Sequence, residues 1–400
     1  MHKPSGRSLA LENATLASGQ RTCIRVEHGL IASLDAAPRP ADLVIDLRGG
    51  RVLPGLINAH DHLQLNGLPR LKYRPRYGNV VEWIDDIRPR LRTEAVLVEN
   101  HSVPREERLL IGGIKNLLSG VTTVAHHDPL HPALLEDSFP VRVVTRFGWS
   151  HSLAMDGEDA ILQSFRQTAP SHPWIIHAAE GTDAAATCEF ERLDAIGCLA
   201  SNTVLVHGTG LTSGQHERLL NAGAGLVWCP ASNLHLFDRT VDIGSLKDRR
   251  HVALGSDSRL SGSRDLLEEL QRARECSALE DAELEAMVTE HPSRILRLAD
   301  RGALRAGTLA DIVAIPRDLA LCRAGRADIS LVLLGGEVSY SDPRHASAFG
   351  EAGCDRVWVD GRPKCLARPL VSRLKVARIR EAGLDWQPRA LPSSLSGVGS

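Results

Sequence analysis

The strongest constraint on the fold is an alternation of apolar, strand-like runs with helical segments that starts near residue 55. Helices are expected at 80–92, 104–119, 157–169, 183–199 and 265–278. Strands are expected at 55–62, 121–126, 141–148, 174–178, 203–207, 225–229 and 251–256. These strands are apolar on both faces, which is typical of a parallel sheet covered by helices.

The number of strands bears on the kind of parallel sheet. A closed β/α barrel has eight strands, and this pattern supplies seven. We therefore predict an α/β fold of the (β/α)8 TIM-barrel type that is distorted or lacks one strand. An eighth strand would have to lie in 127–140 or 149–156.

Both ends of the chain contain short β segments broken by turns, at 7–52 and again from 302 onward. The economical prediction is one small β-sandwich domain built from residues 1–53 and 303–370. The barrel would then occupy 54–302, and a basic helix followed by a loose tail would occupy 371–400.

The composition is that of an ordinary globular protein, with nearly balanced charges. Lys and Arg total 47 against 49 for Asp and Glu, so no global field favours nucleic acid. No apolar run is long enough to span a membrane, and no signal peptide is expected. The eight cysteines form no C-x-x-C pair, which favours reduced thiols in the cytoplasm. Glycine-rich nucleotide loops are absent from the sequence, so a small-molecule substrate without a nucleotide cofactor is expected.

Residues that can bind a metal follow several of the expected strands. His60 and His62 are two residues apart, so on a strand their side chains point to the same side. His177, His207 and Asp257 each follow another apolar run. A single histidine after a strand is more often a hydrogen-bonded structural residue. The carboxyl ends of parallel strands share one edge, however, so the combination predicts a common metal centre.

Five segments in this order resemble the amidohydrolase superfamily, in its cytosine deaminase-like and chlorohydrolase-like branch: VLPGLINAHDH, HAAEG, VLVHGTG, WCPASN and LGSDS. GALRAGTLADIVAI is similar to the segment by which such chains return to their β-sandwich domain. The resemblance covers roughly residues 45 to 362.

The resemblance implies that one divalent metal is held by His60, His62, His177 and Asp257. Zinc is the expected ion, with Fe(II) or Mn as alternatives. None of the six lysines lies at an expected strand end, so a lysine-bridged pair of metals is not expected. A homodimer is the expectation at the level of the family.

The resemblance also implies catalytic roles. Glu180 would shuttle protons, and Asp257 would act as general base as well as ligand. His207 would orient or polarise the attacking water and stabilise the developing oxyanion. A nearby carboxyl suits this chemistry because a leaving nitrogen must be protonated.

Six further residues are candidate substrate contacts: Gln64, His127, Trp149, His151, Asn233 and Arg259. Each has a structural alternative. His127 can cap a turn after its strand, Asn233 can belong to a loop, and Arg259 can point to solvent.

Together these features predict a metal-dependent hydrolase of a non-peptide C–N bond in a small molecule, in the form of a deaminase of an amino-heterocycle. An amidase or cyclic-amide hydrolase is the alternative. From another class, a non-catalytic metal-binding scaffold or sensor remains open.

Overall fold

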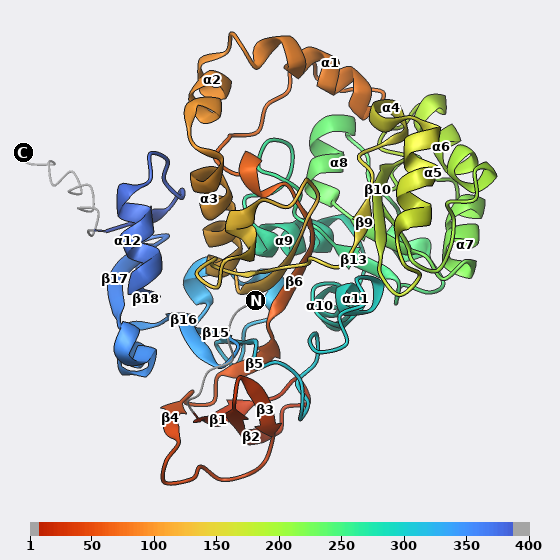
Figure 1. The fold of residues 1–400 in the computed structure, drawn as a ribbon. Coiled ribbons are helices and arrows are strands. Elements are labelled where there is room, and N and C mark those ends of the chain that lie inside the picture. Colours follow the sequence, from red (N-terminus) through yellow and green to blue (C-terminus); the bar gives the residue numbers. More distant parts are fainter. Residues whose placement is uncertain (1–7, 387–400) are drawn as a thin grey trace, which may run out of the picture.

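A computed structural model describes residues 8–386, which form two parallel sheets and one larger mixed sheet (Figure 1). The first parallel sheet has the order β13-β12-β11-β10-β9, and the second has the order β6-β7-β8. Every neighbouring pair in both sheets is parallel. The predicted parallel α/β architecture is therefore confirmed.

The strands of the parallel sheets match the predicted positions with one exception. Their bounds are β6 Leu56–Asp61, β7 Val121–His126, β8 Arg142–Val143, β9 Gly148–Trp149, β10 Trp174–Ala178, β11 Thr203–His207, β12 Gly225–Trp228 and β13 Val252–Leu254. The exception is the segment 141–148, which was expected to be one strand. It is two short strands, because β8 pairs with β7 whereas β9 pairs with β10 in the other sheet.

Helices separate most of these strands, and Figure 1 shows α5, α6 and α7 on the outer side of β9 and β10. The helix bounds are α1 Val80–Arg90, α2 Ala95–Ser102, α3 Arg105–Leu118, α4 Leu153–Asp156, α5 Glu158–Gln167, α6 Ala184–Ala195, α7 Ser213–Asn221, α8 Pro230–Phe237, α9 Leu266–Cys276, α10 Asp281–Ala286, α11 Glu290–Ile295 and α12 Arg368–Val376. In the described part of the chain, none of these helices has the length and apolarity needed to cross a membrane.

The helix α3 illustrates how the sequence produces these elements. Pro104 precedes its first turn, where Glu106 and Glu107 lie near the positive end of the helix dipole. The helix is buried from Leu109 to Leu118 and packs beside β7. In contrast, the stretch around Asn233 and His235 was expected to be a loop, and it is the helix α8. Pro230 occupies the first turn of that helix, where its missing N–H costs nothing.

The mixed sheet joins the two ends of the chain. Its strands are β1 Leu9–Thr15, β2 Arg21–Glu27, β3 Leu30–Ser33, β4 Leu43–Asp46, β5 Arg51–Pro54, β14 Ile312–Ile315, β15 Leu331–Leu334, β16 Glu337–Ser341, β17 Cys354–Val359, β18 Arg362–Ala367 and β19 Leu384–Asp385. The amino-terminal and carboxy-terminal strands meet where β5 pairs antiparallel with β14. The predicted loose tail falls largely in residues 387–400, outside the described residues.

Gly55 connects the mixed sheet to the parallel sheets, since it lies between β5 and β6. A Cβ atom at this position would lie 2.2 Å from Oγ1 of Thr122 on β7. Only glycine lets the strand that carries His60 and His62 run this close to its neighbour.

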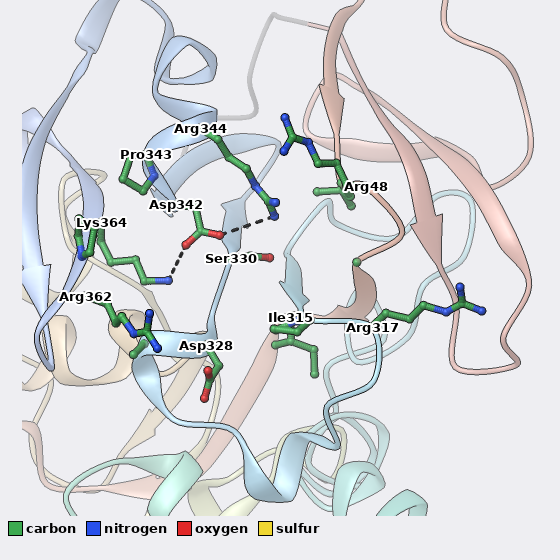
Figure 2. A pocket seen from close by; sticks show the side chains of 15 residues that line it. Arg48, Ile315, Arg317, Asp328, Ser330, Asp342, Pro343, Arg344, Arg362 and Lys364 are labelled. Atoms are coloured by element: carbon green, nitrogen blue, oxygen red, sulfur yellow. Dashed lines mark hydrogen bonds and ion pairs between the residues drawn. The ribbon is translucent and has the colours of Figure 1, made fainter.

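A cavity of about 510 Å³ lies in the mixed sheet and contains none of the predicted site residues (Figure 2). Its lining includes Asp342, which pairs with Nζ of Lys364 at 2.7 Å and with Arg344 at 3.6 Å. Lys364 is buried and also donates to the carbonyl of Ile329. Lys364 therefore takes part in a structural ion pair, at a cavity that none of the predicted site residues lines.

Candidate metal centre

Three imidazoles converge where the ends of β6 and β10 meet. Nε2 of His177 lies 3.3 Å from Nε2 of His60 and 3.3 Å from Nε2 of His62. Ligand atoms around a tetrahedral zinc ion at 2.0–2.1 Å are separated by about 3.4 Å. The spacing of the three nitrogens therefore suits a single ion that all three bind.

Asp257 reaches the same point from the loop after β13. Its Oδ1 is 3.8 Å from Nε2 of His60 and 4.0 Å from Nε2 of His62. The backbone of Asp257 is left-handed, with φ at 51°, which is unfavourable for a residue other than glycine. Hydrogen bonds from N of Ser258 and Oγ of Ser261 fix its carboxylate. The Asp257 carboxylate thus reaches the imidazoles from a locally strained backbone.

The far nitrogens of two of these rings have hydrogen-bond acceptors. Nδ1 of His62 lies 2.9 Å from Oδ2 of Asp128, and Nδ1 of His177 donates to the carbonyl of His151 at 2.8 Å. An acceptor at Nδ1 keeps the proton there and leaves the Nε2 lone pair free for a metal. Gln64 also donates to Oδ2 of Asp128, at 2.6 Å, so it shares this acceptor oxygen with His62.

The protonation of two of the three imidazoles also suits metal binding. Burial lowers the pKa of His60 and of His177 well below the ordinary value, and the neighbouring imidazoles lower it further. Neutral imidazole is the form that binds a metal. In the third imidazole, burial lowers the pKa of His62, but the hydrogen bond and the charge of Asp128 outweigh it and raise the pKa to about 9, so a proton competes with a metal there. The donor set and its geometry fit a divalent ion.

His127 lies beside this trio, with its ring centroid 4.3 Å from that of His177. Its Nε2 donates to the carbonyl of Ser150 at 3.0 Å. Among the described residues, no group bonds to its buried Nδ1. His60, His127 and His177 each offer a ligand atom within 4.8 Å of the others. His127 therefore borders the cluster of imidazoles and offers one further ligand atom to it.

Two proton-handling groups lie next to the imidazoles. Oε1 of Glu180 is 3.4 Å from Nε2 of His207, and both side chains are buried. Burial raises the pKa of Glu180 well above its ordinary value, and the charge of Asp257 adds to this shift. This environment favours the neutral carboxyl form of Glu180 over the charged one.

Asn233 sets the tautomer of His207. Its Oδ1 accepts from Nδ1 of His207 at 2.9 Å, and burial lowers the pKa of the imidazole. The neutral ring then presents a lone pair at Nε2, towards Glu180. Asn233 is thus a partner of a site histidine, from a helix that the sequence did not predict.

The remaining candidates fall into two groups. Trp149 meets His127 edge-on at 5.5 Å, and the ring of His151 lies 4.9 Å from that of His177, so both border the centre. Arg259 instead forms a bidentate ion pair with Glu381, at 2.9 and 2.6 Å. Its guanidinium is occupied by this ion pair, in place of the predicted substrate contact.

Sequence reasoning missed Lys115 altogether and gave Asp128 no role at His62. Lys115 is fully buried on α3, and its Nζ lies 3.2 Å from Oδ2 of Asp61. The helical spacing was a usable signal, because Ile111 and Leu118 lie four and three residues away on the apolar face. A lysine at that spacing must be buried and needs an anionic partner.

The chain is similar to known proteins in sequence and in fold. Residues 171–362 match the family model described as Amidohydrolase family. The chain is 23% identical to a 5-methylthioadenosine/S-adenosylhomocysteine deaminase of Pyrococcus furiosus, over 80% of this chain and 91% of that protein. It is 26% identical to the protein of the same name from Haloarcula marismortui, over 80% and 85%.

Two solved structures have a similar fold. An adenosine deaminase from Xanthomonas campestris with bound zinc superposes with a TM-score of 0.68 and 18% identity, over 84% of this chain and 93% of that one. The atrazine chlorohydrolase of Arthrobacter aurescens, complexed with zinc, gives 0.65 and 18%, over 82% and 94%. At this level of identity the likeness concerns the fold.

Proposed function

We propose, from the premise that this chain carries an Amidohydrolase family domain, that it is a metal-dependent hydrolase that deaminates an amino-substituted heterocycle. It acts on C–N bonds other than peptide bonds. The observation that carries this function is the pair Glu180 and His207, 3.4 Å apart beside three converging imidazoles. A deaminase needs both a strong nucleophile and a group that protonates the departing nitrogen.

His60, His62, His177 and Asp257 would hold the one divalent ion. When bound, the ion lowers the pKa of water so that it can attack a ring carbon at neutral pH. Zinc is the favoured ion, because both similar structures contain zinc and because imidazole is a good ligand for it. Fe(II) and Mn remain alternatives with the same donor set.

Glu180 and His207 would move the protons. The Nε2 lone pair of neutral His207 accepts a hydrogen from the attacking water and so orients it. Glu180 takes one proton from that water and passes it to the ring nitrogen. It then takes the second proton from the newly added hydroxyl group and passes it to the departing amino group, so that water and the amino-heterocycle become a ring carbonyl and ammonia. Its raised pKa suits this work, since burial makes this carboxylate a better proton acceptor than an exposed one. Stabilisation of an oxyanion by His207 would require its protonated form.

The amide-hydrolase alternative would be favoured by an open pocket lined by cations such as Arg259. A pocket with a free guanidinium at Arg259 would suit an anionic amide substrate. Because Glu381 occupies that guanidinium, the deaminase is the better-supported form.

For the fold, we propose that the two parallel sheets are the walls of one TIM-type barrel that lacks a complete β/α unit. Support comes from a hydrogen bond between N of Asp257 and the carbonyl of His60, at 3.1 Å, which links β13 to β6. The barrel would span 54–302, and the β-sandwich domain 1–53 with 303–370, as the pairing of β5 with β14 suggests. The last unit, 371–400, extends beyond the described residues.

Ammonia release tests the function. The zinc-loaded protein is assayed with aminopurine nucleosides, aminopyrimidines, aminotriazines and cyclic amides. We expect ammonia from at least one amino-heterocycle. Ring opening of cyclic amides without ammonia release would contradict deamination, and less than about half an equivalent of metal after chelator-free purification would contradict the metal centre.

A pair of variants tests the mechanism. Glu180→Gln should keep the metal and lose about 10²- to 10⁴-fold in turnover, because the amide cannot shuttle a proton. Glu269→Gln is the matched control, since Glu269 is an equally buried carboxyl that accepts from N of Ala231. Wild-type turnover by Glu180→Gln would show that Glu180 is not the shuttle.

A further inference from the structure

Among the lysines that the structure describes, only Lys115 has its ammonium group beside the segments that form the metal centre. The side chain is 0% exposed and extends from α3 towards the ends of β6 and β13. Its Nζ is 2.8 Å from Oδ1 of Asn66, 3.0 Å from Oγ of Ser256, 3.0 Å from the carbonyl of Asp257 and 3.2 Å from Oδ2 of Asp61.

These acceptors belong to the two segments that carry metal-binding residues. Asp61 lies between His60 and His62, and its side chain points to the opposite side of the strand. Ser256 and Asp257 form the loop that brings the Asp257 carboxylate to the imidazoles. Lys115 therefore bonds to both segments at once, from the side away from the metal.

The charge of Lys115 is well compensated. Burial of an ammonium is expensive unless an opposite charge and further acceptors replace water. Here Asp61 supplies the charge, and its two oxygens also accept from Asn116 at 2.9 Å and from Asn66 at 2.8 Å. A buried network in which each member has partners is rigid. It fixes the separation of the segments that it joins.

The contact with Asp257 has a particular consequence. The residue has a left-handed backbone with φ at 51°, and its carbonyl accepts from Lys115 and from Oγ of Ser256. Without these donors the peptide can relax towards a commoner conformation. That movement would turn the Asp257 carboxylate away from His60 and His62.

We propose that Lys115 is a positioning residue, whose ammonium sets the metal affinity by holding Asp61 on β6 and the carbonyl of Asp257 at a fixed separation. The proposal rests on the proposed metal-dependent function. It assigns Lys115 no contact with substrate, water or metal.

The test compares two buried lysines. Lys115→Met removes the ammonium under the metal centre. Lys364→Met is the matched control, because Lys364 is also buried, pairs with Asp342 at 2.7 Å and lies in the mixed sheet (Figure 2). For each protein, zinc affinity is measured by competition with a chelator, and the stability of the metal-free protein by urea unfolding.

We expect both variants to be less stable and only Lys115→Met to bind zinc about 10- to 100-fold more weakly, as for other partners of metal ligands. Zinc binding by Lys115→Met within twofold of the wild type would overturn the positioning role and leave the proposed function intact. A wild-type protein that binds none of zinc, Fe(II) and Mn would refute the metal-dependent function and the positioning role with it.

A double variant covers the case in which Lys115→Met does not fold. Lys115→Met with Asp61→Asn leaves no uncompensated charge in the interior, so folding is expected. Its zinc affinity should still be lowered at least about tenfold, because one of the two donors to the Asp257 carbonyl is missing and only Oγ of Ser256 remains. Wild-type affinity in this double variant would show that Lys115 only neutralises Asp61, which would overturn the proposal.

Discussion

Asp128 offers a direct test of how the protein orients a metal-binding imidazole. Its Oδ2 lies 2.9 Å from Nδ1 of His62, and the aspartate side chain is only 22% exposed. Replacement by alanine removes the acceptor that keeps the His62 proton on Nδ1. Replacement by asparagine removes the charge but keeps an acceptor oxygen.

The expected magnitude follows from this geometry. Loss of a hydrogen-bond partner to a metal-binding histidine typically weakens metal binding about 10- to 100-fold, or about 1.4–2.7 kcal/mol. We expect Asp128→Ala to reach this range and Asp128→Asn to lose less. Because the pair is largely buried, little of the effect should be screened by salt.

The assay must separate orientation from competition with protons. Burial lowers the pKa of His62, but the hydrogen bond and the charge of Asp128 outweigh it and raise the pKa to about 9. Zinc affinity is therefore measured in chelator buffers at about pH 9.5. There the imidazole of His62 is largely neutral in each protein.

Gln64→Ala is the control for this experiment. It removes the other donor to Oδ2 of Asp128 and leaves the contact with His62 in place. It should change zinc affinity by less than about threefold. Equal affinities for Asp128→Ala and the wild type at this pH would refute the reasoning that Asp128 orients His62.

Two further predictions concern stability. A Cβ atom at Gly112 on α3 would lie 2.3 Å from the carbonyl oxygen of Leu63, so Gly112→Ala should cost about 1–3 kcal/mol in urea unfolding, whereas Gly214→Ala, with nothing within 4 Å, should cost nothing. Equal stabilities would show that the backbones of α3 and Leu63 can separate freely. Burial raises the pKa of Glu269 from 4.5 to about 8, so the folded protein keeps a proton that the unfolded chain releases. Stability should then fall between about pH 4.5 and pH 8, by at most about 5 kcal/mol, and this slope should be smaller in Glu269→Gln; identical slopes would contradict the assignment.

Much of the site could be predicted because its residues follow strands whose apolar runs can be recognised in the sequence. The apolar runs before His177 and His207 are buried strands, and parallel strands present their carboxyl ends at one edge. Their convergence required no knowledge of side-chain packing. The fold class followed from the same alternation of strands and helices.

The contacts that support the site residues could not be predicted from the sequence, for a different reason. Asn233 lies in α8, which replaces the expected loop, and it reaches His207 only because the helix begins immediately after β12. Lys115 and Asp61 are 54 residues apart, and their pairing depends on how α3 packs against β6. Local sequence patterns carry no information on such packing.

The segment 141–149 lies where the fold lacks a complete β/α unit, and this irregularity is close to the site. Two parallel neighbours in one sheet need a crossover of a dozen or more residues, but only residues 144–147 separate β8 from β9. β8 therefore pairs with β7, and β9 pairs with β10. One short segment supplies both strands, with no helix between them. This brings the end of β7 close to the end of β9, where Nε2 of His127 bonds to the carbonyl of Ser150. The short connection at 144–147 thus explains why β8 and β9 pair in different sheets, whereas His127 lies beside His60 because it directly follows β7, the neighbour of β6.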